Sequence, residues 1–323
     1  MIGRYSRQSL LPGIGDEGQA RLGAAHVLVV GAGGLGCALL PWLAGAGVGR
    51  LVIIDDDAIE ESNLHRQPLY RASDIGRAKA EVAREFLRAY NPLIVVEAQT
   101  MRLAPDNAQR LADGADLVVD AADSFAATYV LSDACQAGGK PLVSASVVGM
   151  SGYAGVFCGG GPSYRAVFPD MPTIAADCAT AGVLGPIVAI VGALQARMSL
   201  AMLLGLNPSP LSTLTSYDDA KHPAFGGFGF AGAPEPDSFI PFIAPGEIAA
   251  TDIVVDLRGA EEAPTPAAPW AIRSGVAEIH ALAPRLPEGV RVVLCCRTGL
   301  RASRAADILR SKGRENLALV AFG

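Results

Sequence analysis

The stretch HVLVVGAGGLGCALLPWLAGAGVGRLVIIDDD, residues 26–57, decides the fold class of this chain. A β-branched run at 26–30 stops at a glycine-rich turn, a helical stretch follows to about Ala46, and a second apolar run ends at Asp55. This order predicts a β-α-β unit with two parallel strands. Three further apolar runs, separated by helical segments, extend the pattern: residues 93–97, 116–120 and 141–145. We therefore expect a Rossmann-like, doubly wound and mostly parallel α/β sheet.

The glycine-rich turn lies between a strand and a helix, as in phosphate-binding loops. Its glycines let the backbone approach a phosphate, which then meets the free N–H groups and the positive end of the helix. Asp55 follows about 20 residues later, where a carboxylate accepts ribose hydroxyls. The motif predicts a nucleotide but does not separate NAD from ATP, and close helix-sheet packing is the alternative role of the glycines. The four glycines are Gly31, Gly33, Gly34 and Gly36.

Composition divides the chain of 323 residues into two modules. Residues 222–246 are dense in Gly and Pro and have no regular period. We place a nucleotide-binding domain at 1–222, a linker at 223–248 and a short second α/β domain at 249–323. The second module begins with the strand-like IVVDLR and ends in a helix-like segment after RVVLCC.

Charge and hydropathy argue against a nucleic-acid partner and against a membrane-spanning segment. The net charge is −6 and no Lys/Arg block occurs, so we expect no nucleic-acid partner. The N-terminus lacks the pattern of a secretory signal. The apolar run 181–206 is interrupted by Gly, Pro, Gln and Arg, which favours a buried helix over a membrane span. We expect a soluble, cytoplasmic protein.

Several polar residues downstream of the glycine turn, together with one near the start of the chain, suit a polyanion. A carboxylate that attacks the α-phosphate of ATP carries the same sign of charge as its target, so cations must offset both. Mg²⁺ is usually held by one or two carboxylates together with phosphates. Each residue alone is more typical of a surface charge, and only their combination favours ATP. They are Arg7, Asn63, Arg66, Gln67, Lys79 and, as the Mg²⁺ ligand, Asp123.

Seven motifs occur in order over residues 4 to about 205: RYSRQ, GAGGLGC, IIDDD, SNLHRQ, IGRAKAE, DAADS and DCATAGVLGP. In this the chain resembles the ThiF/MoeB/HesA group of sulfur-carrier protein adenylyltransferases, relatives of the ubiquitin-activating enzymes. The resemblance implies activation of the C-terminal Gly-Gly carboxylate of a small ubiquitin-like carrier as an acyl adenylate. The implied pathways are thiamine and molybdenum-cofactor biosynthesis, and which of them applies stays open.

The same resemblance implies roles for individual residues. Asp55 binds the ribose, Asp57 belongs to the nucleotide-binding set, and Asp123 holds Mg²⁺. The triphosphate is surrounded by Asn63, Arg66, Gln67 and Lys79. The arginine that matches Arg7 reaches into the neighbouring subunit, which implies a homodimer.

Cys178 matches the family's conserved thiol, a nucleophile toward an acyl adenylate. A small buried side chain is its alternative role. At the positions of the family's first zinc pair this chain has Ser163 and Ala166, so we expect no zinc. The family's Asp-Cys-Thr-Asp-Asn is DAADS here, which keeps Asp123 and replaces its neighbour by Ser124.

The C-terminal module contains CRTGLR, residues 296–301, between a strand and a helix. Successive backbone N–H groups and two guanidinium groups beside Cys296 favour a thiolate or a persulfide. The loop resembles the active loop of a rhodanese, although the module is short. It predicts sulfur transfer, with a cysteine desulfurase as a further partner, and a packing role is the alternative.

Two other functions remain open at this point. An NAD-dependent oxidoreductase would explain the glycine turn and Asp55, although no His for hydride transfer is evident. A non-catalytic carrier-binding scaffold would explain the altered DAADS motif and the short tail.

Overall fold

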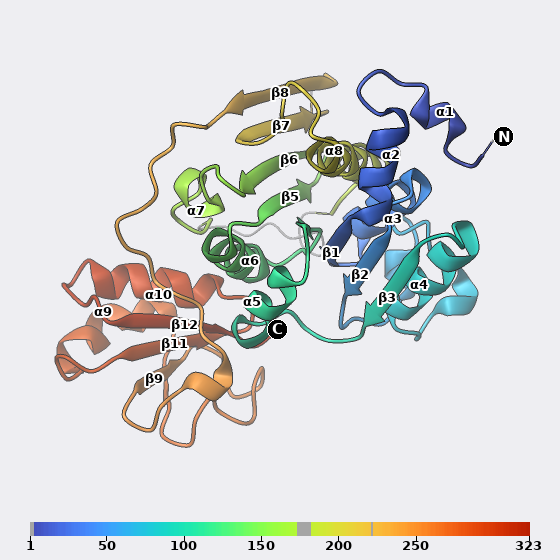
Figure 1. Ribbon diagram of the computed structural model, residues 1–323. Coiled ribbons are helices and arrows are strands. Elements are labelled where there is room, and N and C mark those ends of the chain that lie inside the picture. Colours follow the sequence, from blue (N-terminus) through green and yellow to red (C-terminus); the bar gives the residue numbers. More distant parts are fainter. Residues whose placement is uncertain (1–2, 173–181, 221) are drawn as a thin grey trace.

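The computed structural model describes residues 3–172, 182–220 and 222–323. They form an eight-stranded sheet of order β3-β2-β1-β4-β5-β6-β7-β8 and a separate four-stranded sheet (Figure 1). The larger sheet is parallel from β3 to β5 and continues by antiparallel pairing to β8. Its strands are β1 (His26–Val30), β2 (Arg50–Ile54), β3 (Val95–Gln99), β4 (Leu117–Asp120), β5 (Pro141–Val148), β6 (Ser151–Cys158), β7 (Thr213–Asp218) and β8 (Ala224–Gly229). The predicted doubly wound, mostly parallel α/β sheet is confirmed.

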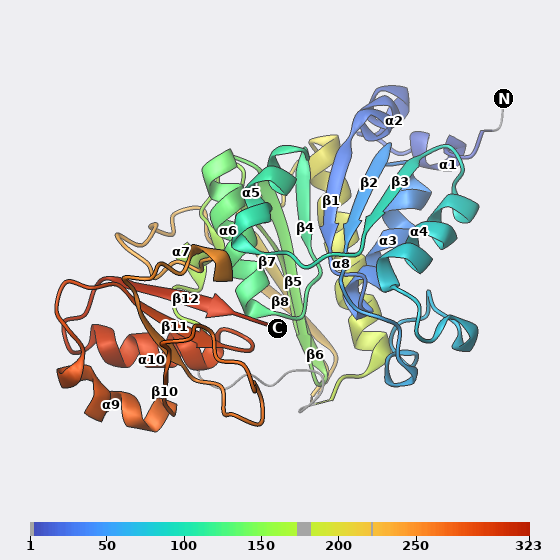
Figure 2. The same cartoon turned by 90° about the horizontal axis from the view of Figure 1, so that it is seen from below.

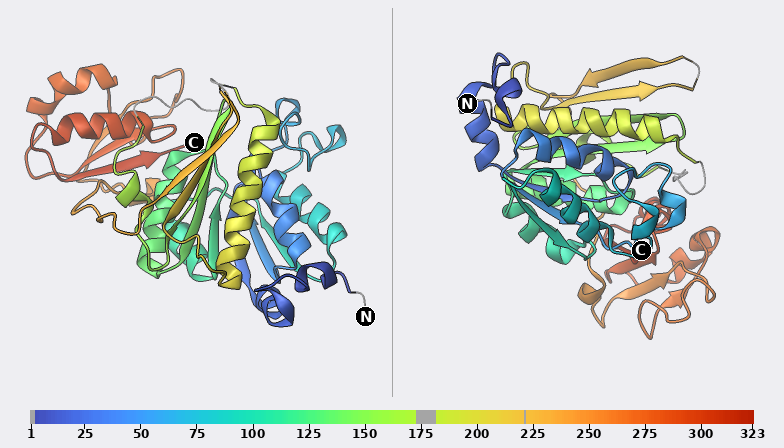
Figure 3. Two further views of the ribbon diagram at one scale, coloured as in Figure 1. Left: turned by 90° about the horizontal axis from the view of Figure 1, so that it is seen from above. Right: turned by 90° about the vertical axis from the view of Figure 1, so that its right-hand side faces the viewer.

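Both faces of the parallel half are buried because helices cover each of them. Along β1, Val27 and Val29 join the core on one face, and Leu28 and Val30 join the core on the other. A strand buried on both faces reads as a continuous apolar run, which is why residues 26–30 lack alternation. One face carries α3 (Gly34–Ala46), α4 (Lys79–Tyr90) and α8 (Gly185–Leu204), and the other carries α5 (Pro105–Asp113) and α6 (Phe125–Gly138) (Figure 3).

Several short helices lie outside these layers. The N-terminal helices α1 (Ser6–Ser9) and α2 (Gly15–Ala24) lie beside the ends of α3 and α8 (Figure 1). A further short helix, α7 (Tyr164–Val167), follows β6. The 3-10 helices are η1 (Glu61–Asn63), η2 (Ala72–Asp74), η3 (Pro245–Glu247), η4 (Val276–Glu278) and η5 (Ala283–Arg285).

Helix α8 is long and apolar enough to cross a membrane by length and composition, and 56% of that span is buried within the described structure. It packs beside α3 and over β5 and β6 (Figure 3). Its Gln195 is fully buried, and the side-chain Nε2 donates hydrogen bonds to the carbonyls of Asp120 at 2.6 Å and Val143 at 3.0 Å. The helix is therefore tied to two strands of the sheet through a buried polar side chain.

The smaller sheet forms the C-terminal module. Its strands, all parallel, are β9 (Ile253–Asp256), β10 (Ile272–Arg273), β11 (Val292–Cys296) and β12 (Leu317–Ala321), in the order β10-β9-β11-β12. Its helices are α9 (Ile279–Leu282) and α10 (Leu300–Arg310). Leu294 and Ala302 share one apolar cluster with Ala126 of α6, so the module packs on the α5/α6 side of the large sheet (Figure 2).

The segment between the modules is fastened to the first one. Residues 224–229, assigned to the linker by composition, form the edge strand β8, because a glycine-rich strand can still pair through its backbone. Glu235 then accepts hydrogen bonds from the Ser163 backbone N–H at 2.7 Å and hydroxyl at 2.6 Å. The Arg165 guanidinium lies over the Phe239 ring, and its Cζ is 4.2 Å from the ring centroid. Thus a carboxylate and an aromatic ring attach this segment to α7, and Ser163 occupies one of the two positions compared with a zinc pair.

Candidate active site

The glycine turn is shaped by contacts between backbone segments. Gly31 has φ +99, and a Cβ there would lie 2.4 Å from the carbonyl oxygen of Ala121. A Cβ at Gly36 would lie 2.3 Å from the carbonyl oxygen of Gly31. A side chain at either position would therefore collide with a neighbouring backbone carbonyl. The contact also brings the loop after β1 against the loop after β4, which carries Asp123.

The other two glycines start α3. Gly33 is its N-cap residue, and no side chain among the described residues caps the helix. In the described part of the chain, an added Cβ at Gly33 would have only the Gln67 Nε2 within 4 Å, at 3.7 Å. At Gly34 the added Cβ would be 3.7 Å from the carbonyl oxygen of Arg66. The N-terminus of the 13-residue helix α3 therefore lies beside Arg66 and Gln67. An anion bound there would meet free N–H groups.

Gln67 carries an unused acceptor beside this helix end. It is 2% exposed, and its Oε1 has no hydrogen-bond partner among the described residues. Buried polar atoms are normally paired, so an orphan points to a missing ligand or water. Asn63 and Arg66 make local contacts: Asn63 Oδ1 accepts the Glu60 N–H at 3.3 Å, and Arg66 donates to the Ser62 carbonyl at 3.0 Å.

Asp55 already binds the turn through its carboxylate. Its Oδ2 accepts the Ala32 N–H at 2.7 Å and its Oδ1 accepts the Asp57 N–H at 2.9 Å. Burial raises the pKa of Asp55, while these N–H groups and Lys79 lower it. Each carboxylate oxygen keeps a second lone pair, so Asp55 can still accept ribose hydroxyls.

Lys79 is the first residue of α4 and is held at the edge of the turn. Its Nζ lies 2.7 Å from Asp57 Oδ2, and its backbone N–H donates to the Asp57 carbonyl at 3.0 Å. The Lys79 side chain is 8% exposed and that of Asp57 is 65% exposed. The Lys79 ammonium group is thus positioned by the solvent-facing carboxylate of Asp57. A phosphate can displace this carboxylate.

Asp123 is exposed in the loop between β4 and α6, and the fully buried Asp120 holds that loop. Asp120 accepts hydrogen bonds from the hydroxyls of Thr128 at 2.7 Å and Ser144 at 2.8 Å, and from the Ala122 N–H at 3.2 Å. Burial raises the pKa of Asp120 to about 6, against the lowering effect of these donors. Asp120 is not among the residues predicted from the sequence, although its place at the end of a buried strand is a signal.

Arg7 is the predicted residue that the fold keeps away from this site. Its neighbour Gln8 donates to the carbonyl of Ala46, the last residue of α3, at 3.0 Å. The glycine turn is at the other end of that helix, and 13 residues span about 20 Å. Arg7 is exposed and does not meet the glycine turn of its own chain.

Of the two predicted thiols, the structure describes Cys296. Cys178 is outside the described residues. Cys296 ends β11, and its buried Sγ accepts the N–H groups of Gly299 at 3.1 Å and Ala302 at 3.4 Å. A Cβ on Gly299 would lie 3.3 Å from Cβ of Ala126, so this loop touches the first turn of α6. By contrast, burial raises the pKa of the adjacent Cys295 to about 12.

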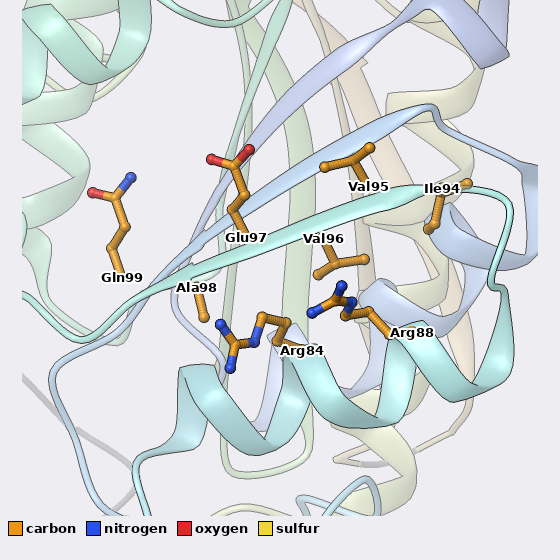
Figure 4. A pocket seen from close by; sticks show the side chains of 8 residues that line it. All are labelled: Arg84, Arg88, Ile94, Val95, Val96, Glu97, Ala98 and Gln99. Carbon is orange, nitrogen blue, oxygen red and sulfur yellow. The ribbon is translucent and has the colours of Figure 1, made fainter.

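Neither of two surface hollows is lined by residues of the glycine turn. One, of about 440 Å³, lies along the edge strand β3 beside Arg84 and Arg88 of α4 (Figure 4). The other, of about 310 Å³, is lined mostly by apolar side chains of α2, α3, α8 and the segment after α1, including Leu11 and the 60% exposed Trp42. Among the described residues no three His, Cys, Asp or Glu side chains are grouped to hold a metal ion.

Comparison with known proteins covers the first two-thirds of the chain. The ThiF family model matches residues 5–226. A sulfur carrier protein adenylyltransferase of Thermus thermophilus is 45% identical over 67% of this chain and 83% of its own length. The SAMP-activating enzyme E1 of Haloferax volcanii is 42% identical over 67% of this chain and 81% of its own. A probable adenylyltransferase/sulfurtransferase MoeZ of Mycobacterium tuberculosis is 42% identical, and the match spans 57% of its length.

Solved structures share the fold. MccB of E. coli with ATP has a TM-score of 0.61 at 22% identity, over 72% of both chains. MccB with a peptide, MccA-N7isoASN, has a TM-score of 0.63 at 23% identity, over 72% of this chain and 74% of that one. The relatives named here do not support the oxidoreductase or the scaffold alternative.

Asp120 makes stability depend on pH in a direction that can be tested. A carboxyl whose pKa is raised from 3.8 to about 6 stabilises the fold below pH 4 and loses that contribution by pH 6, about 3 kcal/mol in all. Asp120→Asn removes this titration. Urea unfolding should therefore show the variant gaining stability relative to the wild type between pH 4 and pH 7. Parallel pH curves for the two proteins, like those expected for the exposed Asp106→Asn, would contradict the assignment.

Proposed function

The chain belongs to the ThiF family, and from this we propose that it is an ATP-dependent adenylyltransferase for a sulfur-carrier protein. The carrier's C-terminal Gly-Gly carboxylate attacks the α-phosphorus of ATP. The new P–O bond forms as the bond to pyrophosphate breaks, which leaves an acyl adenylate and releases pyrophosphate. The relatives named sulfur carrier protein adenylyltransferase and SAMP-activating enzyme support this assignment.

One observation carries the proposal: the glycine turn is in contact with the segments that supply Asp55, Arg66 and Asp123. Gly31 meets Ala121, which precedes Asp123, and Ala32 is bound by Asp55. Gly34 lies against Arg66. Four sequence-distant segments therefore meet at the N-terminus of α3, at the carboxyl ends of β1, β2 and β4.

The chain's own groups can perform the binding steps. The N-terminus of α3, Arg66 and Lys79 offset the charge of the phosphates, and Asp55 orients the ribose. Gln67 adds amide donors and an unused acceptor at the same place. Asp123 fits a Mg²⁺ site completed by phosphate oxygens, and the ion would neutralise charge on the leaving pyrophosphate.

We propose that the enzyme acts as a homodimer in the cytoplasm. Arg7 is too far from its own glycine turn to act there, and it lies on α1 beside the hollow lined by Leu11 and Trp42. An exposed apolar surface of this kind suits a protein interface. A second copy seated on it would place Arg7 at the interface between the two subunits.

The C-terminal module suggests a second activity on the same chain. We propose that it is a short rhodanese-like domain in which Cys296 accepts sulfur as a persulfide, from thiosulfate or a cysteine desulfurase. Two backbone N–H groups donate to its Sγ. The contact of Gly299 with Ala126 brings this loop to the α6 end of the adenylation site. Sulfur delivered there would enter thiamine or molybdenum-cofactor biosynthesis.

Pyrophosphate exchange tests the main proposal. With ATP, Mg²⁺ and a panel of small ubiquitin-like carriers ending in Gly-Gly, we expect ATP-pyrophosphate exchange that depends on one carrier. Asp123→Ala should lower the exchange rate by about 100-fold, because the Mg²⁺ that would neutralise charge on the leaving pyrophosphate loses its carboxylate ligand. Asp106→Ala, at an exposed position on α5, is the matched control. The proposal fails if no carrier supports exchange, or if both variants exchange like the wild type.

Mixed dimers test whether Arg7 acts across subunits. Arg7→Ala and Lys79→Ala should each be nearly inactive alone. Co-expressed, random pairing leaves one intact site in half of the dimers, so exchange should recover to about a quarter of the wild-type rate if the enzyme is a two-fold dimer. Absence of recovery in co-purified mixed dimers would show that Arg7 does not serve the neighbouring site.

Thiosulfate sulfurtransferase activity tests the C-terminal module. The Cys296 thiolate attacks the outer sulfur of thiosulfate, a persulfide forms and sulfite leaves; cyanide then removes the sulfur as thiocyanate. We expect Cys296→Ser to abolish thiocyanate formation and Cys295→Ser to preserve it, because Cys295 lies on the other side of the strand with its thiol buried. A wild-type protein that forms neither thiocyanate nor a persulfide would reduce the module to a packing role.

A further inference from the structure

The Ala32 peptide group in the glycine turn is held from both sides. Its N–H donates to Asp55 Oδ2 at 2.7 Å. Its carbonyl accepts the Tyr70 hydroxyl at 2.6 Å. Tyr70 is 5% exposed, and burial raises its pKa, so the phenol keeps its proton and remains a donor at neutral pH.

The same hydroxyl also lies at the start of α4. It is 3.2 Å from the carbonyl oxygen of Lys79. The hydroxyl proton is therefore shared between the Ala32 and Lys79 carbonyls. The Tyr70 backbone N–H donates to the Gln67 carbonyl at 3.1 Å. Tyr70 therefore joins the glycine turn, the Lys79 backbone and the segment that carries Gln67.

We propose that Tyr70 is a positioning residue for ATP: its hydroxyl keeps the glycine turn and Lys79 at the spacing that a triphosphate requires. This inference rests on the proposed function. Asp55 holds the N–H side of the Ala32 peptide, and the Tyr70 hydroxyl holds its carbonyl side. Tyr70 itself need not touch the nucleotide, because it acts through Lys79 and the backbone of the turn.

Calorimetric titration with MgATP tests this on the full chain, without the carrier. Tyr70→Phe removes only the hydroxyl and leaves a buried carbonyl unsatisfied, so we expect ATP to bind about tenfold more weakly. AMP should lose less affinity, because it lacks the phosphates that Lys79 is expected to meet. The control is Tyr90→Phe, at a 45% exposed tyrosine of α4, which should bind ATP like the wild type.

A double-mutant cycle separates positioning from general stability. If Tyr70 acts through Lys79, the loss caused by Tyr70→Phe should shrink in a Lys79→Ala background, since neighbours that share a function are not additive. Thermal unfolding of each variant shows whether the fold is intact. The inference is overturned if Tyr70→Phe binds ATP like the wild type, if ATP and AMP lose affinity equally, or if the two substitutions are additive. A wild-type protein that binds no ATP would instead refute the proposed function.

Discussion

The absence of a side chain at Gly31 is the constraint on which the site depends. It lets the turn after β1 lie directly against the carbonyl of Ala121, and no other residue can do so, since a Cβ would come within 2.4 Å. That approach aligns the start of α3 with the loop that carries Asp123. Asp55 and Tyr70 then form hydrogen bonds to Ala32 of the turn in the position that this contact gives it.

Hydrogen bonds to buried groups then make the turn rigid. Asp55 and Tyr70 hold the two sides of the Ala32 peptide, and Asp120 holds the neighbouring loop through Thr128 and Ser144. Such bonds add little net stability when they are made but are costly to break, because the partner is left buried and unpaired. The charged groups that would meet ATP are therefore supported by Tyr70 and Asp120, which are buried and hydrogen-bonded.

The C-terminal module extends this arrangement rather than standing apart from it. Its apolar cluster is continuous with that of α6, and Glu235 and Phe239 attach the intervening segment to α7. Cys296 at the end of β11 and the glycine turn at the end of β1 both lie at the carboxyl edge of a parallel sheet, where ligands of such sheets commonly bind. Packing of the two modules on one face brings these edges together.

By itself, the sequence determined the parallel sheet, the nucleotide turn and the family, because strand periodicity, glycine spacing and seven ordered motifs are local properties of residues 4–205. It also named Asp55, Lys79 and Asp123. Only the tertiary structure decided that Arg7 lies at the far end of α3, that Tyr70 and Asp120 support the site, and that residues 224–229 form a strand. Those outcomes depend on contacts between segments far apart in sequence, and no local pattern records which buried hydroxyl or carboxylate will meet which carbonyl or N–H.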